Sequence, residues 1–163
     1  MKILKAIGGT LLCLVLLAAI LYPFRRDPIG MLAGRQLTGP EAAYPESWDF
    51  SDAFQTIAVE VRPDDPHSVT TICFVHEGAL YVPSLNAPEK EWPAMVVADA
   101  RVRLKIGGKV YPASARREEP DDRTPYLESA AKKYPQLADR VDPPPPDLWL
   151  FRIGPRRGPG GGG

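Results

Sequence analysis

The chain is poor in the residues that build disulfide frameworks and metal centres, with only two cysteines and two histidines in 163 residues. Cys13 lies in an apolar N-terminal run and Cys73 in an expected core strand, so they cannot pair within one chain. Asp64, Asp65 and His67 lie close together, but prolines interleave with them, and a solvated turn is the simpler interpretation. The sequence therefore predicts neither a disulfide nor a metal site.

The chain also lacks an excess of charge of either sign, because 20 basic residues balance 20 acidic residues. A protein that binds nucleic acid through its phosphates carries a basic patch, so no nucleic-acid partner is predicted. The sequence contains neither a recognisable Ser-His-Asp arrangement nor a glycine-rich phosphate loop. These absences leave the catalytic residues unknown and leave open whether the protein is an enzyme.

Charge is missing altogether from residues 6–22. A helix of this length spans roughly 25 Å at about 1.5 Å per residue, near the lower limit for crossing a bilayer. Lysines precede this run and arginines follow it. We therefore expect residues 3–24 to bind the membrane as an uncleaved anchor. A cleaved signal peptide and a buried helix are the alternatives.

An N-terminal anchor with a short basic head more often leaves the rest of the chain outside. We therefore expect a single-pass protein of a bacterial-type inner membrane, with its domain on the periplasmic or extracytoplasmic side. The glycine- and proline-rich end of the chain is of low complexity and is expected to be disordered. The predicted divisions are an anchor or signal peptide at residues 1–24, a tether and lead-in at 25–53, a folded domain at 54–155 and a tail at 156–163.

Hydrophobic alternation and turn residues predict that the folded domain is mainly β with two or three short helices, an α+β fold. The final strand is expected to close a barrel. The expected elements are a strand at residues 56–62, a hairpin at 69–84, a helix at 89–99, a hairpin at 101–116, a helix at 124–134 and a strand at 147–153.

The second hairpin is expected to have one apolar and one basic face. A two-residue turn at Gly107-Gly108 places Leu104 opposite Tyr111 and Val102 opposite Ala113. The opposite face then carries a row of cations, which is most simply a solvated sheet face; anionic headgroups or a phosphate are the alternative partners. The cations are Arg101, Arg103 and Lys105.

The first hairpin is expected to be buried on both faces. A turn at Glu77-Gly78 places Leu80 and Val82 on one face and Phe74 and Tyr81 on the other, so both faces are apolar. A sheet with a doubly covered centre and singly covered edges is typical of a small closed or partly closed barrel.

The order of these motifs resembles the split β-barrel superfamily of flavin- and deazaflavin-binding proteins. That superfamily includes pyridoxamine-phosphate-oxidase-like proteins and deazaflavin-dependent nitroreductases. The resemblance covers roughly residues 54–155 and implies a split β-barrel. The motifs that carry it are Tyr81-Val82-Pro83-Ser84, Lys90-Glu91-Trp92 with its short helix, Ala98-Asp99-Ala100-Arg101-Val102, the Gly107-Gly108 hairpin and Lys133-Tyr134-Pro135.

The resemblance implies a cofactor, FMN or a deazaflavin, at the interface of a homodimer. Hydroxyl and lysine donors suit its phosphate, and an indole can cover a planar ring system. The residues that match the family's pocket are Ser84, Asn86, Lys90 and Trp92, with Arg62 and Thr70 as weaker candidates.

Two functions remain open at this point. In the first, the domain is a membrane-anchored oxidoreductase in which a flavin or deazaflavin acts on an unknown small molecule. In the second, it is a cofactor-free binding or structural module tethered to the membrane. The nitroreductases carry a basic, glycine-containing phosphate loop where this chain has Asp64 and Asp65, and that difference favours the second function.

Overall fold

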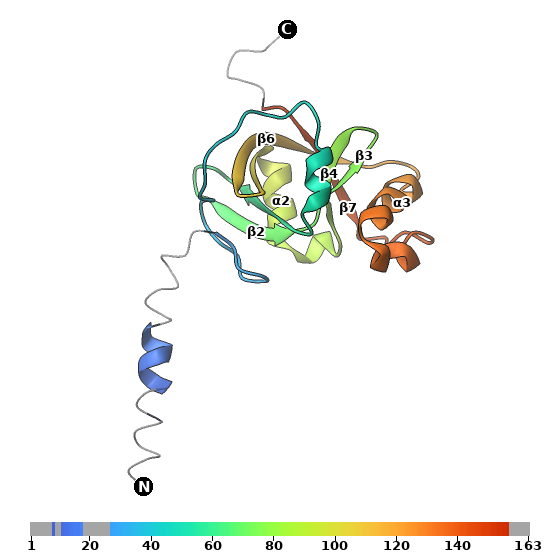
Figure 1. Ribbon diagram of the computed structural model, residues 1–163. Coiled ribbons are helices and arrows are strands. Elements are labelled where there is room, and N and C mark those ends of the chain that lie inside the picture. The colour runs from blue at the N-terminus through green and yellow to red at the C-terminus, as the bar shows by residue number, and fades with distance from the viewer. Residues whose placement is uncertain (1–7, 9–10, 18–26, 157–163) are drawn as a thin grey trace.

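The computed structural model describes residue 8, residues 11–17 and residues 27–156, and the ordered domain in it is mainly β (Figure 1). Short helices fill the connections between strands. In chain order the elements are η2 (Asp49–Ala53), β1 (Ile57–Val61), β2 (His67–Thr71), β3 (Phe74–His76), β4 (Ala79–Ser84), η3 (Ala87–Glu89), α2 (Glu91–Ala98), β5 (Arg101–Ile106), β6 (Lys109–Glu118), α3 (Thr124–Lys133), η4 (Pro135–Arg140) and β7 (Trp149–Gly154).

The seven strands form one antiparallel sheet in the order β2-β1-β5-β6-β7-β4-β3. β2 and β3 lie at opposite ends of this order, yet only Ile72 and Cys73 separate them in the chain. Because so short a link cannot cross a flat seven-stranded sheet, the sheet must curl until its two edges meet. The predicted α+β split β-barrel is therefore the architecture of this domain.

The long strand β6 joins the two halves of the barrel. Its first half, up to Ser114, pairs with β5, and its second half, from Ser114 onward, pairs with β7. β7 in turn pairs with β4, so the last strand connects the second hairpin to the first. The C-terminal strand therefore links the two hairpins into one barrel, which is the role that the sequence predicted for it.

The predicted register of the second hairpin is confirmed, since Leu104 pairs with Tyr111 and Val102 with Ala113. Gly107 and Gly108 have φ values of 58° and 81°, as a two-residue hairpin turn requires. A Cβ atom at Gly107 would also lie 2.7 Å from the ring of Phe54, so glycine is needed there for space as well.

The predicted first hairpin is correct in register but wrong in length. Phe74 pairs with Tyr81 and Val75 with Leu80 around the Glu77-Gly78 turn. The expected long first strand at residues 69–77 is instead broken, because β2 pairs with β1 whereas β3 pairs with β4. The chain thus leaves one edge of the sheet after Thr71 and joins the other edge at Phe74, with Ile72-Cys73 between them.

Two apolar cores lie on opposite faces of β4, as the sequence predicted. The larger core fills the barrel and includes Leu80, Val82 and the helix α2, which presents Trp92 and Val96 to it. The smaller core lies outside the barrel, between β3, β4 and α3. Its buried members are Phe74, Tyr81, Leu127, Ala130, Leu148 and Leu150.

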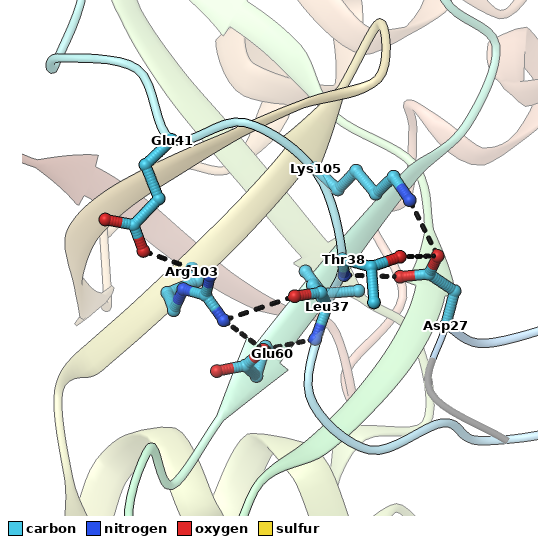
Figure 2. Close-up of polar contacts among 7 residues, drawn as sticks. All are labelled: Asp27, Leu37, Thr38, Glu41, Glu60, Arg103 and Lys105. Carbon is cyan, nitrogen blue, oxygen red and sulfur yellow. Dashed lines mark hydrogen bonds and ion pairs between the residues drawn. The ribbon is translucent and has the colours of Figure 1, made fainter. Parts of the chain in front are cut away.

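Residues 27–42, which we call the strap, lie across β1 and β5 instead of forming a loose tether. The strap amide of Leu37 donates to the buried carboxylate of Glu60 at 2.6 Å. Arg103 donates to the same carboxylate at 2.9 Å, and Lys105 pairs with Asp27 at 2.7 Å (Figure 2). The expectation of a solvated cationic face is therefore wrong for Arg103 and Lys105, which the strap covers, and holds for Arg101, which stays exposed.

The N-terminal anchor and the C-terminal tail fall mainly outside the described residues. The predicted anchor at residues 3–24 is described only at residue 8 and residues 11–17, and the tail only at residue 156. Within residues 8, 11–17 and 27–156, none of the helices has the length and apolar character that a membrane crossing requires.

Candidate functional site

A cavity of about 230 Å³ lies outside the barrel, against the face of β4 that carries the smaller core. Its apolar walls include Ile72 from the β2–β3 link, Leu127 from α3 and Leu148 from the segment before β7. These walls come from parts of the chain that the curling of the sheet brings together. The cavity is therefore a product of the barrel and not of one local motif.

Two cations, Lys90 and Arg140, line this apolar cavity. Lys90 immediately precedes α2, and Arg140 is the last residue of η4. Both side chains are exposed, and neither forms an ion pair with any described residue. An apolar cavity with unpaired cations suits a ligand with a flat apolar part and an anionic end.

The end of β4 and the turn after it bring Lys90 to the cavity. Pro83 and Leu85 line the cavity, whereas Ser84, between them, points to the other face because strand side chains alternate. Asn86 then adopts a left-handed conformation, with φ of 52°, and η3 follows. Asparagine tolerates this conformation better than most residues, so the tight turn is encoded locally.

Ser84 and Trp92, two of the predicted pocket residues, lie in the interior of the domain. Ser84 is only 1% exposed, and its hydroxyl has no hydrogen-bond partner among the described residues. The Trp92 ring packs 5.3 Å from the ring of Phe151 within the barrel core. Neither side chain lines the cavity, whereas the predicted residue Lys90 does.

The other predicted residues are dispersed. Asn86 is exposed at the turn before η3. Arg62 forms an ion pair with Asp65 at 3.1 Å, within its own turn. Thr70 pairs with Ala58 in the sheet, and its neighbour Thr71 lines the cavity in its place. The structure thus brings only Lys90, of the six predicted residues, into the lining of the cavity.

Sequence reasoning missed Arg140 and the apolar wall formed by α3 and η4. The available signal was the spacing of Leu127, Ala130 and Leu137, which marks one apolar face along a helix and its continuation. This face cannot be assigned to a cavity without knowing which surface it covers. Arg140 lies in η4, in a segment for which the sequence predicted no element.

A polar cluster around Lys133 lies beside a second hollow of about 370 Å³. The Lys133 ammonium donates to the carbonyl of Ser51 at 2.8 Å and lies 3.6 Å from the sulfur of Cys73. Burial raises the pKa of the Cys73 thiol, and the nearby Lys133 charge only partly offsets this. Cys73 is fully buried in the core, in agreement with the packing role that the sequence predicts for it.

Tyr134 fixes the end of α3 to the β2–β3 link. Its hydroxyl donates to the carbonyl of either Gln55 or Cys73, each 3.0 Å away. Burial raises the pKa of Tyr134 to about 12, so the hydroxyl stays protonated as a donor. This contact holds the α3 wall of the cavity in place.

No family model matches the chain, and no curated protein matches it in sequence. Solved structures do share its fold. The conserved hypothetical protein Rv2991 from Mycobacterium tuberculosis is 20% identical, with a TM-score of 0.54 over 74% of this chain and 87% of that one. HutZ, the heme storage protein from Vibrio cholerae, is 14% identical, with a TM-score of 0.52 over 68% of this chain and 87% of its own.

A structure of an F420-H2-dependent reductase, FDR-A, is also among the similar folds, at 20% identity and a TM-score of 0.49 over 61% of this chain and 94% of that chain. Together with the strand order, the likenesses to Rv2991 and HutZ confirm the predicted fold resemblance. The domain therefore has the split β-barrel fold.

Proposed function

We propose that this domain binds a flavin or a deazaflavin in the cavity beside β4 and takes part in redox chemistry on a small molecule. The proposal rests on one observation: on a split-barrel fold, a cavity with apolar walls is also lined by Lys90 and Arg140, which form no ion pair with the described residues. The bound cofactor would supply the electron or hydride transfer. The protein would supply binding, orientation and exclusion of water.

The residues of the cavity fit such a group. Ligand pockets usually measure about 300–1,000 Å³, so a cavity of about 230 Å³ suits part of the ring system rather than a whole cofactor. Ile72, Leu127 and Leu148 would contact the ring. Lys90 and Arg140 would bind the phosphate, because charge-assisted hydrogen bonds to phosphate are the strong ones.

The acidic turn that distinguishes this chain from the nitroreductases does not oppose this proposal. Asp64 is bound by Arg101 at 2.7 Å, and Asp65 by Arg62 at 3.1 Å. Both carboxylates are exposed, so solvent and salt screen their charge, and neither lines the cavity.

A titration of the full chain in detergent tests the proposal. FMN and a deazaflavin are each added while the quenching of the cofactor's fluorescence is followed. We expect saturable binding that is lost in the Lys90→Ala, Arg140→Ala double variant and kept in the matched Lys109→Ala variant, whose cation lies on the exposed β5–β6 turn. A chain that binds neither cofactor would contradict the proposal.

The alternative is a cofactor-free binding or structural module. It is favoured by Ser84 and Trp92, because these predicted pocket residues are buried in the barrel. In that case the cavity would accept an anionic apolar ligand that is not redox-active, or none. Absence of cofactor binding, together with an unchanged folded state, would support this alternative.

We further propose that residues 3–24 anchor the chain in a bacterial-type inner membrane, with the domain on the extracytoplasmic side. The support is the uncharged run at residues 6–22 and its flanking cations. Protease added to intact spheroplasts should degrade the domain, whereas protection until lysis would place the domain in the cytoplasm. Failure of the chain to sediment with membranes would contradict the anchor itself.

We also propose a homodimer, because a second copy of the chain would cover the open side of the cavity. Sedimentation of the full chain in detergent should give a dimer mass. A monomer at all concentrations would contradict this arrangement.

A further inference from the structure

An exposed apolar turn lies at the start of the described domain. The backbone of Ile29 and Leu32 closes it with two hydrogen bonds of 3.0 and 2.9 Å, and Gly30 has a φ of 56°. The side chains of Ile29, Met31 and Leu32 are 65%, 104% and 54% exposed. Figure 1 shows this turn, in blue, projecting from the body of the domain.

This exposure is concentrated in one place. Among residues 27–156, the other large apolar side chains that are exposed are Phe50 and Val97, which stand singly. Scattered apolar side chains on a surface are ordinary, but a contiguous group marks a surface that contacts another body. Three such side chains in a four-residue turn form that kind of group.

The turn is held firmly against the domain on both sides. Before it, Asp27 accepts hydrogen bonds from Thr38 and Lys105 (Figure 2). After it, Gly34 exchanges two backbone hydrogen bonds with Ser68, at 2.7 and 3.1 Å. Because both flanks are fixed, the turn cannot fold back to cover its own apolar side chains.

The position of the turn in the chain identifies its partner. The uncharged run at residues 6–22 ends shortly before Asp27. Residues 23–28, between this run and the turn, extend at most roughly 22 Å, at about 3.3–3.6 Å per residue. An anchored chain therefore keeps this turn beside the bilayer surface.

The charges near the turn fit an anionic lipid surface. Arg25 and Arg26 precede the turn, and the exposed Arg35 follows it. The carboxylate nearest to the turn in sequence, that of Asp27, forms an ion pair with Lys105 at 2.7 Å. Clustered arginines beside a membrane-spanning segment attract anionic headgroups.

We propose that the turn at residues 29–32 is a second membrane contact, which inserts Ile29, Met31 and Leu32 into the interfacial layer of the bilayer that holds the anchor. This inference rests on the proposed anchor. Two points of contact, one on each side of residues 23–28, fix the orientation of the barrel relative to the membrane.

The test uses the full chain in vesicles of phosphatidylcholine and phosphatidylglycerol. A Cys13→Ser background leaves Cys73, which is fully buried, as the only native cysteine. An environment-sensitive fluorophore is attached to a Met31→Cys variant and, as the matched control, to an Asp121→Cys variant in the exposed β6–α3 connection. Sedimentation with the vesicles is measured on the same samples.

We expect the Met31→Cys probe to shift its emission to the blue and to lose most of its intensity in brominated lipid, while the Asp121→Cys probe does neither. If the chain sediments with vesicles but both probes report water, the turn proposal is overturned and the anchor stands. If the chain stays in solution, both proposals fail. A blue shift without lipid that grows with protein concentration would identify a second copy as the occupant and overturn the membrane contact.

Discussion

Two groups of cations in this domain have the same chemistry and opposite surroundings. On β5, Arg103 and Lys105 lie under the strap and are bound to Glu60 and Asp27. At the cavity, Lys90 and Arg140 have no ion-pair partner among the described residues. The first group holds two parts of the chain together, and the second is free to bind a ligand.

The comparison shows how burial separates structural from functional charge. The side chain of Arg103 is 12% exposed and that of Glu60 only 2%, so each needs the other to offset its lost hydration. The exposed cations at the cavity remain hydrated and need no partner for stability. Substitutions in the two groups should therefore affect different measurements.

The largest effect is expected for Arg103→Ala. It leaves the buried carboxylate of Glu60 without its cation, at a cost of about 3–5 kcal/mol in the free energy of unfolding. Chemical unfolding followed by tryptophan fluorescence measures this cost. The exposed Arg101→Ala variant is the control, and its midpoint should barely move.

The Glu60→Met, Arg103→Met double variant sharpens this first prediction. Replacing both members of a buried pair by apolar side chains removes the uncompensated charge, so much of the stability should return. An Arg103→Ala midpoint equal to that of the native chain would show that the pair is not structural.

Next in size is the effect of Lys90→Ala on ligand binding. A lost charge-assisted hydrogen bond is worth roughly 1.5–3 kcal/mol, or about ten- to a hundredfold in the Kd of FMN or deazaflavin. The free energy of unfolding should not change, in contrast to Arg103→Ala. Equal losses of stability and affinity would remove the distinction between the two groups of cations.

A third, intermediate effect is expected for Lys133→Met. The Lys133 side chain is nearly buried and donates to the carbonyl of Ser51, so its loss leaves that acceptor unsatisfied. The expected cost is about 1–3 kcal/mol in the free energy of unfolding. Lys132→Met, at the exposed neighbouring position, is the matched control, and similar midpoints for both variants would contradict this prediction.

The smallest effect is expected at acid pH, where protonation of Asp27 breaks the contact between the strap and Lys105 of β5. Burial acts to raise the pKa of Asp27, but hydrogen bonds from Lys105 and Thr38 outweigh it and hold the pKa below the usual value of 3.8. A carboxyl whose folded pKa is lowered adds stability above its unfolded pKa and loses it as pH falls through the folded pKa.

The strap contact should therefore be intact at neutral pH and be lost only as pH falls below 3.8, through the lowered folded pKa of Asp27. The amide resonance of Thr38, which donates to Asp27, reports this transition in an NMR titration. The Asp27→Asn variant should lack the transition, and its persistence in that variant would assign it to another group.

Much of the sheet could be predicted from local sequence. Gly107-Gly108 and Glu77-Gly78 determine two turns, and turn geometry determines register over the strands that follow. The alternation of Val102 and Leu104 correctly predicted the face that enters the core. Local geometry carries this information because neighbouring strands of a hairpin are also neighbours in the chain.

The candidate site could not be predicted in the same way. Lys90 was found through the resemblance, but its cavity partners Arg140 and Leu148 lie far along the chain. Similarly, nothing local to Arg103 shows that Glu60 will lie beside it. These residues are far apart in the sequence, so local patterns cannot predict their contacts, which form only when the sheet curls.

The sequence by itself determined the hairpins, their registers and the two apolar faces of β4, because side-chain alternation and turn residues act over a few positions. Only the tertiary structure decided where the first predicted strand breaks, which cations are paired and where the cavity lies. The reason is physical: the curled sheet brings its two edges together at Ile72-Cys73, and β4, α3 and the segment before β7 then surround a common space, although they are far apart in the chain.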